Sequence, residues 1–153
     1  MAKIVHLIAI GKLKDKELLI IEQHYLKQIK NPPLNIYEIK ACAENPDKEA
    51  ESVCKKIQEI TNNESYKLFL LAEKGKLFDS PNFSQWLYHH LETVQSLIFV
   101  LGGVQGHGKS LLKLPHEKIS LSPMTFPHML ARILFVEQYY RAQTINNKHP
   151  YHY

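Results

Sequence analysis

The sequence is poor in cysteine and contains no long apolar run. Its two cysteines, Cys42 and Cys54, lack a Cys-x-x-Cys spacing, so we expect small buried apolar side chains rather than a disulfide or a redox pair. No apolar run reaches the length of about 18 residues that a transmembrane helix needs. The first residues lead straight into a strand-like segment without a signal-peptide cleavage site, and we therefore expect a cytoplasmic protein.

Potential metal ligands are also sparse. His149 and His152 have a spacing that metal sites use, but no cysteine or acidic side chain lies near them in the sequence. A structural zinc site normally needs four such ligands. We therefore expect a protein that requires no metal.

Arginine is scarce, and its positions coincide with the charge imbalance of the chain. Both arginines lie within residues 101–153, where Lys and Arg outnumber Asp and Glu by six to two. Residues 1–100 hold equal numbers of lysines and acidic residues, so the last third carries the entire net charge of +4. Such a segment favours a polyanionic partner, either nucleic acid or a phosphorylated cofactor, although a solvated basic helix face has the same composition.

Strand-like and helical segments alternate along the chain. Apolar, β-branched runs occur at residues 3–10, 34–39, 66–72 and 96–101, followed by a short run at 119–121. The intervening segments have apolar residues at helical spacing, and Asn45-Pro46 and Ser80-Pro81 each place a capping side chain before a first-turn proline. The pattern predicts one α/β domain over residues 1–153, with a mostly parallel sheet flanked by helices.

Three loops follow predicted strands, at residues 72–76, 102–108 and 122–127. In parallel sheets, loops and helix N-termini gather beyond the carboxyl ends of the strands, so ligands bind there. The second loop contains four glycines, which let the backbone approach a ligand closely. We therefore expect the ligand site at these loops.

Residues 103–110 match the phosphate-loop pattern G-x-x-x-x-G-K-S between a strand and an expected short helix. In this interpretation Lys109 would reach the outer phosphates and Ser110 would bind magnesium. A nucleotide hydrolase also needs an aspartate at the end of an apolar strand, and none of the three aspartates has that position. A phosphate-loop nucleotide-binding protein stays an alternative function, and a non-catalytic RNA-binding module is another.

The same third of the chain resembles a known family. The matching residues are Gly102-Gly103 after an apolar strand, Leu121-Ser122 followed by Met124-Thr125-Phe126-Pro127-His128, Arg132, Glu137-Gln138, Tyr140-Arg141-Ala142 and the ending Tyr151-His152. They resemble the small bacterial ribosomal large-subunit pseudouridine methyltransferases, which form the RlmH family of the SPOUT class. Val104 and Gln105 stand where the family often has proline and an acid.

The resemblance implies an enzyme that uses S-adenosylmethionine to methylate N3 of a pseudouridine in a stem-loop of bacterial 23S rRNA, either free or in the ribosome. It also implies a homodimer and a C-terminal trefoil knot, which no sequence pattern predicts because knots are rare. The residues implied to hold the methyl donor are Leu71, Gly102, Gly103, Leu121, Ser122, Pro123, Met124, Thr125 and Phe126. Backbone groups of these loops would read the adenine edge.

Methylation of an imide nitrogen needs an aligned methyl group, loss of the imide proton and stabilisation of negative charge on the neighbouring carbonyls. Arg141, Tyr151 and His152 are the candidate catalytic residues, and we expect them to grip the nucleotide. Because a neutral imidazole titrates near working pH, His152 is the candidate for proton removal, with water as the alternative.

The last helix, expected over residues 127–146, is apolar around much of its circumference. Such a helix needs a partner surface, and packing against a second copy would place one subunit's tail beside the other's donor site. Arg132 and Arg141 lie half a turn out of phase at about 100° per residue, so they cannot face one surface. We expect Arg141 to contact RNA and Arg132 to be structural or to lie at the subunit boundary.

Overall fold

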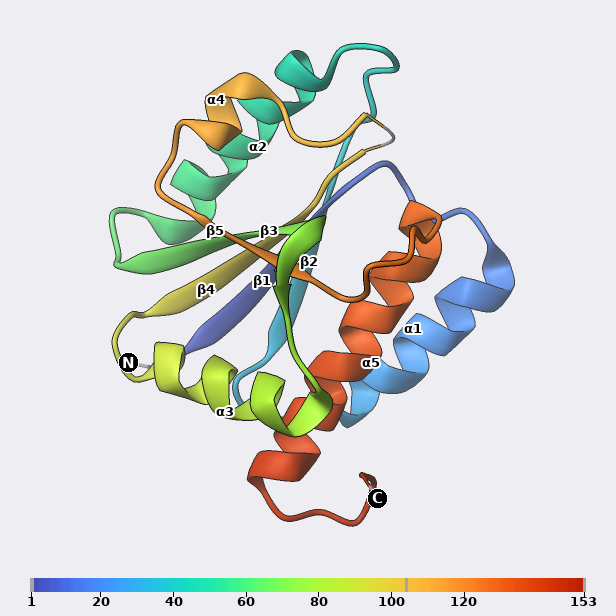
Figure 1. Cartoon of the computed structure of the whole chain (residues 1–153), viewed down its shortest axis with the longest axis vertical. Helices are drawn as coiled ribbons and strands as arrows, with labels where there is room; N and C mark the ends of the chain where they lie inside the picture. The colour runs from blue at the N-terminus through green and yellow to red at the C-terminus, as the bar shows by residue number, and fades with distance from the viewer. Residues whose placement is uncertain (1, 104, 153) are drawn as a thin grey trace.

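The computed structural model describes residues 2–103 and 105–152. The five strands form one sheet in the order β2-β1-β4-β3-β5, and neighbouring strands are parallel (Figure 1). The strands are β1 (Ile4–Ile10), β2 (Leu34–Ile39), β3 (Tyr66–Leu77), β4 (Ser96–Leu101) and β5 (Glu117–Ser120). The helices are α1 (Lys16–Gln28), α2 (Pro46–Thr61), α3 (Ser80–Leu91), α4 (Lys109–Leu112) and α5 (His128–Asn146). The expected α/β class is confirmed, whereas the trefoil knot stays a prediction.

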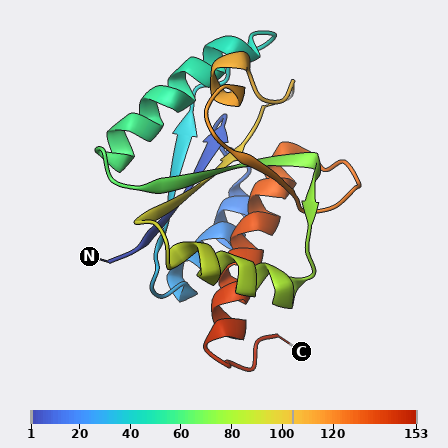
Figure 2. The same ribbon diagram turned by 60° about the vertical axis from the view of Figure 1, so that its left-hand side comes forward.

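Helices cover both faces of the sheet (Figures 1 and 2). Successive side chains of a strand point to opposite faces, so Leu97 and Phe99 of β4 pack in the core under α1, α3 and α5. Ile98 and Val100 pack in a second core under α2 and α4. All six residues of β4 are buried, as expected for a central strand that is covered on both faces. None of the described helices is long and apolar enough to cross a membrane.

Strand β3 continues five residues beyond its expected end. Its register slips between Leu71 and Lys76, and both residues pair with Ile119 of β5. Gly75 lies so close to the backbone of Ile119 that a Cβ at this position would clash with it. The loop expected at residues 72–76 is therefore a bulge within the strand, held against β5 by the absence of a side chain at Gly75.

Short polar side chains begin three of the helices, with Asp15 at the start of α1. Asn45 caps α2 as expected, because its side chain accepts a backbone N–H of the first turn at 3.1 Å. The expected cap of α3 at Ser80 is wrong, since Asp79 accepts the backbone N–H of Asn82 at 2.8 Å. Ser80 Oγ instead donates to Gln138 Oε1 at 2.7 Å, which ties the start of α3 to α5.

Arg132 has a structural role, as expected for one of the two arginines. Its buried guanidinium binds Glu22 through Nε at 2.7 Å and Nη2 at 2.9 Å, and it binds Glu38 through Nη1 at 2.7 Å. Glu38 also accepts the backbone N–H of Leu13 at 2.9 Å. The network therefore joins α5 to α1, to β2 and to the loop after β1.

Candidate functional site

Three strands meet at one level near the carboxyl edge of the sheet. Leu71 of β3 pairs with Leu101 of β4 and with Ile119 of β5, so the bulge of β3 and the segments that follow β4 and β5 lie side by side. Thr125 Oγ1 donates to Glu73 Oε1 at 2.8 Å, which joins the segment after β5 to the bulge of β3. The structure thus brings together the three segments that the resemblance assigns to the methyl donor, here called the donor segments.

Hydrogen bonds within the donor segment at residues 121–126 set its path. Ser120 Oγ donates to the carbonyl oxygen of Ser122 at 2.8 Å, and Ser122 Oγ accepts the backbone N–H of Met124 at 3.0 Å. The half-buried members of the segment are Leu121, Ser122 and Phe126, and the exposed members are Pro123, Met124 and Thr125. These bonds hold the backbone path of residues 120–124.

His107 links two of the donor segments, although the sequence does not predict it as a site residue. Its Nε2 atom lies 2.9 Å from the carbonyl oxygen of Leu71, and a Cβ added to Gly102 would lie 3.0 Å from its Cε1 atom. Burial lowers the pKa of His107, and the hydrogen bond to Leu71 opposes this shift only in part. The ring is therefore neutral at neutral pH and donates from Nε2 to the carbonyl. A single histidine in a glycine-rich turn carries no sequence signal for this contact.

The two glycines of the turn are held between close neighbours. A Cβ on Gly103 would lie 2.9 Å from Glu49 Oε1 and 3.2 Å from Ile10 Cγ2, and one on Gly102 would meet the His107 ring. The turn therefore offers main-chain groups rather than side chains to a ligand. Such a turn fits an adenosine-bearing ligand that is read through the backbone.

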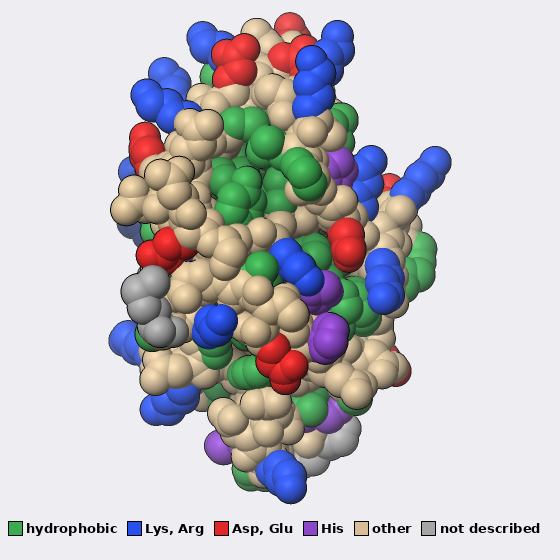
Figure 3. Space-filling view, turned by 90° about the vertical axis from the view of Figure 1, so that its left-hand side faces the viewer, with side chains coloured by type: hydrophobic (Ala, Val, Ile, Leu, Met, Phe, Trp, Pro, Cys, Tyr) green, Lys and Arg blue, Asp and Glu red, His purple; other side chains and the backbone are tan. Residues whose placement is uncertain are grey.

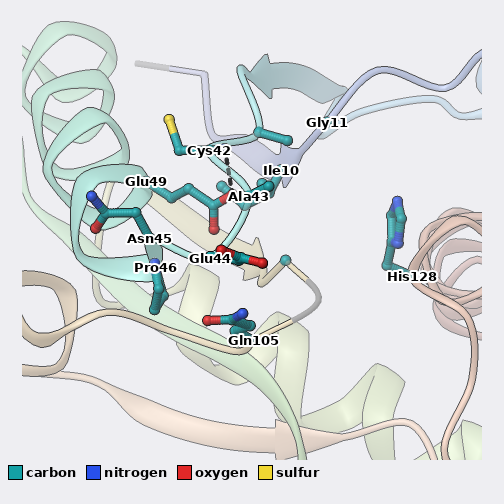
Figure 4. Close-up of a pocket in the computed structure, with 12 residues that line it drawn as sticks. Ile10, Gly11, Cys42, Ala43, Glu44, Asn45, Pro46, Glu49, Gln105 and His128 are labelled. Atoms are coloured by element: carbon teal, nitrogen blue, oxygen red, sulfur yellow. Dashed lines mark hydrogen bonds between the residues drawn. The ribbon is translucent and has the colours of Figure 1, made fainter.

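A pocket of about 380 Å³ opens beside this turn (Figure 4). Its lining includes Ile10, Cys42, Glu49, Gly103, Gln105 and His128, which come from the ends of β1, β2 and β4 and from the starts of α2 and α5. Glu49 is buried, and its Oε2 accepts the backbone N–H of Cys42 at 2.8 Å. The sequence does not predict this pocket, because only the strand order brings the loops after β1 and β2 to the glycine turn.

The two cysteines differ from the expectation of full burial. Both are free and half-buried, and Cys42 lines the pocket. Cys54 lies on α2, where its Sγ atom is 3.9 Å from Ser110 Oγ. Neither forms a disulfide in the structure, so the expectation of unpaired thiols agrees with it.

Contacts of α4 contradict the phosphate-loop interpretation. The backbone N–H of Lys109 donates to Asp47 Oδ1 at 2.8 Å. Gly108 packs so tightly on Pro46 that a Cβ would clash with the Pro46 carbonyl oxygen. A carboxylate thus occupies the amide that would cradle phosphate, and its negative charge would repel that ligand. Gly108 and Lys109 instead dock α4 onto the start of α2.

The three candidate catalytic residues lie together at the C-terminal end of α5 and form what we call the tail cluster. Arg141 is on the helix itself, and Tyr151 and His152 follow its end. Arg141 Nη1 donates to His152 Nδ1 at 3.0 Å, and Arg141 Cζ lies 4.7 Å from the centre of the Tyr151 ring. The hydrogen bond from Arg141 to Glu137 raises the pKa of Arg141. Burial, together with a hydrogen bond to Tyr25, raises the pKa of Tyr151. The cluster therefore presents a permanent cation, a protonated phenol and an imidazole.

The tail cluster and the donor segments lie at opposite ends of α5 (Figure 1). The helix has 19 residues, which corresponds to a length of roughly 28 Å at about 1.5 Å per residue. The segment at residues 121–126 directly precedes the start of α5, whereas the tail cluster lies at its C-terminal end, with Arg141 on the helix and Tyr151 and His152 beyond it. Within one protomer the structure does not bring the two groups of predicted site residues together.

The fold and the site define an α/β protein with a ligand site made of backbone turns at the carboxyl edge of a parallel sheet. Residues 4–152 match the family described as "Predicted SPOUT methyltransferase", and the chain belongs to this family. It is therefore a methyltransferase, and its methyl donor is S-adenosylmethionine. When bound, the donor supplies an electrophilic methyl group on a sulfonium.

Curated relatives match from about three quarters to nearly all of the chain. A protein of Synechococcus sp. (strain CC9311) is 42% identical over 146 residues, which are 95% of this chain and 94% of the relative. A protein of Acholeplasma laidlawii is 36% identical over 149 residues, which are 97% of this chain and 98% of the relative. A third, from Parabacteroides distasonis, is 45% identical over 112 residues, covering 72% of this chain and 68% of the relative. All three are named ribosomal RNA large subunit methyltransferase H.

Proposed function

We propose that this enzyme methylates N3 of a pseudouridine in a stem-loop of 23S rRNA, either free or in the ribosome, in the cytoplasm, and that residues 1–153 act as one domain. The observation that carries the proposal is the tail cluster. It groups a permanent cation, an aromatic ring and an imidazole on the segment that holds the whole net charge of +4. Cationic side chains bind phosphates, and aromatic and guanidinium planes stack on unpaired RNA bases. The names of the relatives support RNA of the large ribosomal subunit as the substrate.

The proposed donor site lies among Leu71, the turn at Gly102 and Gly103, and residues 121–126. The pairing of Leu71 with β4 and β5 supports this assignment, since all three segments begin at one level of the sheet. The close packing of both glycines supports it as well, because backbone groups line the turn. No group of three or more potential metal ligands gathers among residues 2–103 and 105–152, and the proposed reaction requires no metal.

A homodimer would complete the site. On α5, Met129, Leu130 and Leu134 are 39% to 43% exposed, and Ile20 and Ile21 are exposed on the neighbouring helix α1. Exposed apolar side chains gathered on adjacent helices are typical of a protein interface. Two copies packed through antiparallel α5 helices would place each tail cluster beside the start of the partner's α5, and so beside its donor segments.

The charge distribution also favours two cooperating protomers. Figure 3 shows the face seen from the left of Figure 1, on which Lys and Arg side chains are interspersed with acidic ones. A mixed surface of this kind attracts RNA only weakly, because neighbouring charges of opposite sign cancel over a Debye length. Two copies would bring together two of the segments at residues 101–153, each of which carries a net charge of +4.

The tail cluster is oriented to stabilise charge on the base. Arginine only donates hydrogen bonds, so His152 Nδ1 accepts from Arg141 and the neutral ring carries its proton on Nε2. In this arrangement both side chains can donate to the carbonyl oxygens that flank N3, where negative charge develops. The N3 proton itself then needs another acceptor.

The test combines ligand binding with methylation of rRNA. S-adenosylhomocysteine is expected to bind in a calorimetric titration, and ATP with magnesium is not. With labelled S-adenosylmethionine, the methyl group should appear on N3 of one pseudouridine of 23S rRNA, identified by mass spectrometry of nuclease fragments from free rRNA and from ribosomes. Binding of RNA without S-adenosylhomocysteine, or a methyl group on another class of substrate, would overturn the proposal.

A further inference from the structure

We propose that the pocket beside Gly103 holds the pseudouridine base, and that Glu49 takes the N3 proton. The inference rests on the proposed methyl transfer, because it assigns the position of the acceptor and the destination of the proton in that reaction. Two features carry this inference. One is the pocket, and the other is the buried carboxylate of Glu49, which belongs neither to the donor segments nor to the tail cluster.

The pocket shares a wall with the donor site. Gly103 lines the pocket and also belongs to the turn assigned to the donor. His128, which lines another side of the pocket, begins α5 directly after the donor segment at residues 121–126. A base in the pocket and a donor on the turn would therefore meet at Gly103.

Glu49 is a fixed, buried acid at this meeting point. It is 7% exposed, and its Oε2 is held by the backbone N–H of Cys42 at 2.8 Å. Oε1 points toward Gly103, since a Cβ added to that glycine would lie 2.9 Å from it. Among residues 2–103 and 105–152, no group donates a hydrogen bond to Oε1. Figure 4 shows the carboxylate among the residues that line the pocket. One oxygen is therefore occupied, and the other faces the turn.

The shape and chemistry of the pocket suit a flat base with imide groups. Its volume of about 380 Å³ falls within the range of about 300–1,000 Å³ that small-ligand pockets have. Ile10 and Ala43 provide apolar walls, the Gln105 amide and the His128 imidazole are available to carbonyl oxygens, and a carboxylate accepts an N–H. Enzymes that modify a base in a folded nucleic acid extrude it into such a pocket.

The tail of a second protomer would reach the same place. His128 is the first residue of α5. Antiparallel packing of two α5 helices would set this N-terminal end beside the partner's tail cluster. The titratable groups around the base would then be Glu49, the rim residue Glu44, Cys42 and His128 from this chain. Because the tail cluster donates hydrogen bonds, Glu49 is the buried group of this set that can accept the proton.

The proposed step balances in atoms and charge. The N3–H bond breaks, and its proton passes to Glu49 Oε1 while N3 forms a bond to the methyl carbon. The carbon–sulfur bond breaks at the same time, and its electron pair stays on sulfur, which leaves S-adenosylhomocysteine. The positive sulfonium and the negative carboxylate both become neutral, so no charge is stranded in the pocket.

The test uses Glu49→Gln in the full-length protein. Glutamine can still accept the N–H of Cys42, but it takes up no proton. We expect single-turnover methylation of rRNA to slow by at least about a hundredfold, the usual contribution of a general base, with affinity for S-adenosylhomocysteine within about threefold of wild type. The rate of the variant should recover as the pH is raised, because an imide that ionises in solution needs no base. Glu51→Gln, an exposed acid on the same helix, is the matched control and should be unchanged.

A second variant tests the pocket independently of the proton. Ala43→Leu narrows the pocket from an exposed wall position and should slow methylation by at least about tenfold with unchanged donor affinity. A rate of Glu49→Gln near wild type, or a slow rate that does not recover at high pH, would overturn the role of Glu49. An unimpaired Ala43→Leu would overturn the base pocket. If the wild-type enzyme methylates no rRNA, the proposed function itself fails, and this inference fails with it.

Discussion

His107 Nε2 lies 2.9 Å from the carbonyl oxygen of Leu71. This hydrogen bond connects the glycine turn after β4 to the last residue of β3 that pairs with β4, while the His107 ring fills the space beside Gly102. A side chain that contacts no methyl acceptor therefore positions two of the three donor segments.

Replacement of His107 by alanine is expected to weaken binding of S-adenosylhomocysteine. Loss of a hydrogen bond worth about 1 kcal/mol, together with the lost packing beside Gly102, corresponds to roughly a tenfold change in Kd. Isothermal titration calorimetry measures this change directly. His89→Ala, at an exposed position of α3, is the matched control. Equal affinities of wild type and His107→Ala would show that the contact does not position the donor.

Replacement of Arg132 by leucine is expected to destabilise the fold strongly. It leaves Glu22, whose side chain is 3% exposed, and Glu38 without their cation, and breaking a buried ion pair from one side costs about 3–5 kcal/mol. Urea unfolding gives the free energy of unfolding. Glu59→Gln breaks an exposed pair with Lys56 and should cost less than about 1 kcal/mol. Similar losses in the two variants would contradict the structural role of Arg132.

The stability of the protein is expected to fall on mild acidification because of His6. This residue is 4% exposed, and burial lowers its pKa from 6.5 to about 4. Between these two values the unfolded chain binds a proton that the folded chain does not, so the free energy of unfolding decreases as the pH falls. The decrease is about 3 kcal/mol over the whole window. Urea unfolding at a series of pH values should show a shallower decrease for His6→Leu, and identical slopes would refute the assignment.

Two inactive variants are expected to restore activity when they share a dimer. Gly102→Leu disrupts the donor turn and Arg141→Ala removes the cation of the tail cluster, so each homodimer should be inactive. In a random mixture of subunits, half of the dimers are mixed and each carries one intact site, which corresponds to about a quarter of wild-type activity. Leu134→Glu, which charges the exposed face of α5, should abolish the rescue. A mixture without activity would show that donor site and tail act within one protomer.

Local patterns were sufficient for most elements, and they failed where two similar signals compete. Strand β4 is a continuous apolar run and appears over the predicted residues. Asp79 and Ser80 are both good capping residues, and the choice of Asp79 depends on the bond from Ser80 to Gln138 of α5. The extra length of β3 likewise depends on pairing with β5 across a bulge at Gly75.

The sequence predicted the donor segments, but it did not predict Glu49 or His107 as site residues. The donor segments follow strands and contain the glycines, so spacing and resemblance were enough to propose them. Glu49 and His107 gave no such signal, because a helical glutamate and a single histidine are common on any surface. Their importance comes from contacts with Gly103, Cys42 and Leu71, which lie at positions distant in the chain or in another segment.

By itself, the sequence determined the alternation of strands and helices, the position of the net positive charge and the composition of the turns, since each of these depends on residues that are close along the chain. The tertiary structure decided which turns become neighbours. The order β2-β1-β4-β3-β5 puts the loop after β2 beside Gly103, and the direction of α5 carries the tail cluster away from the donor segments. Strand order and helix direction result from packing of the whole chain, which no local pattern encodes.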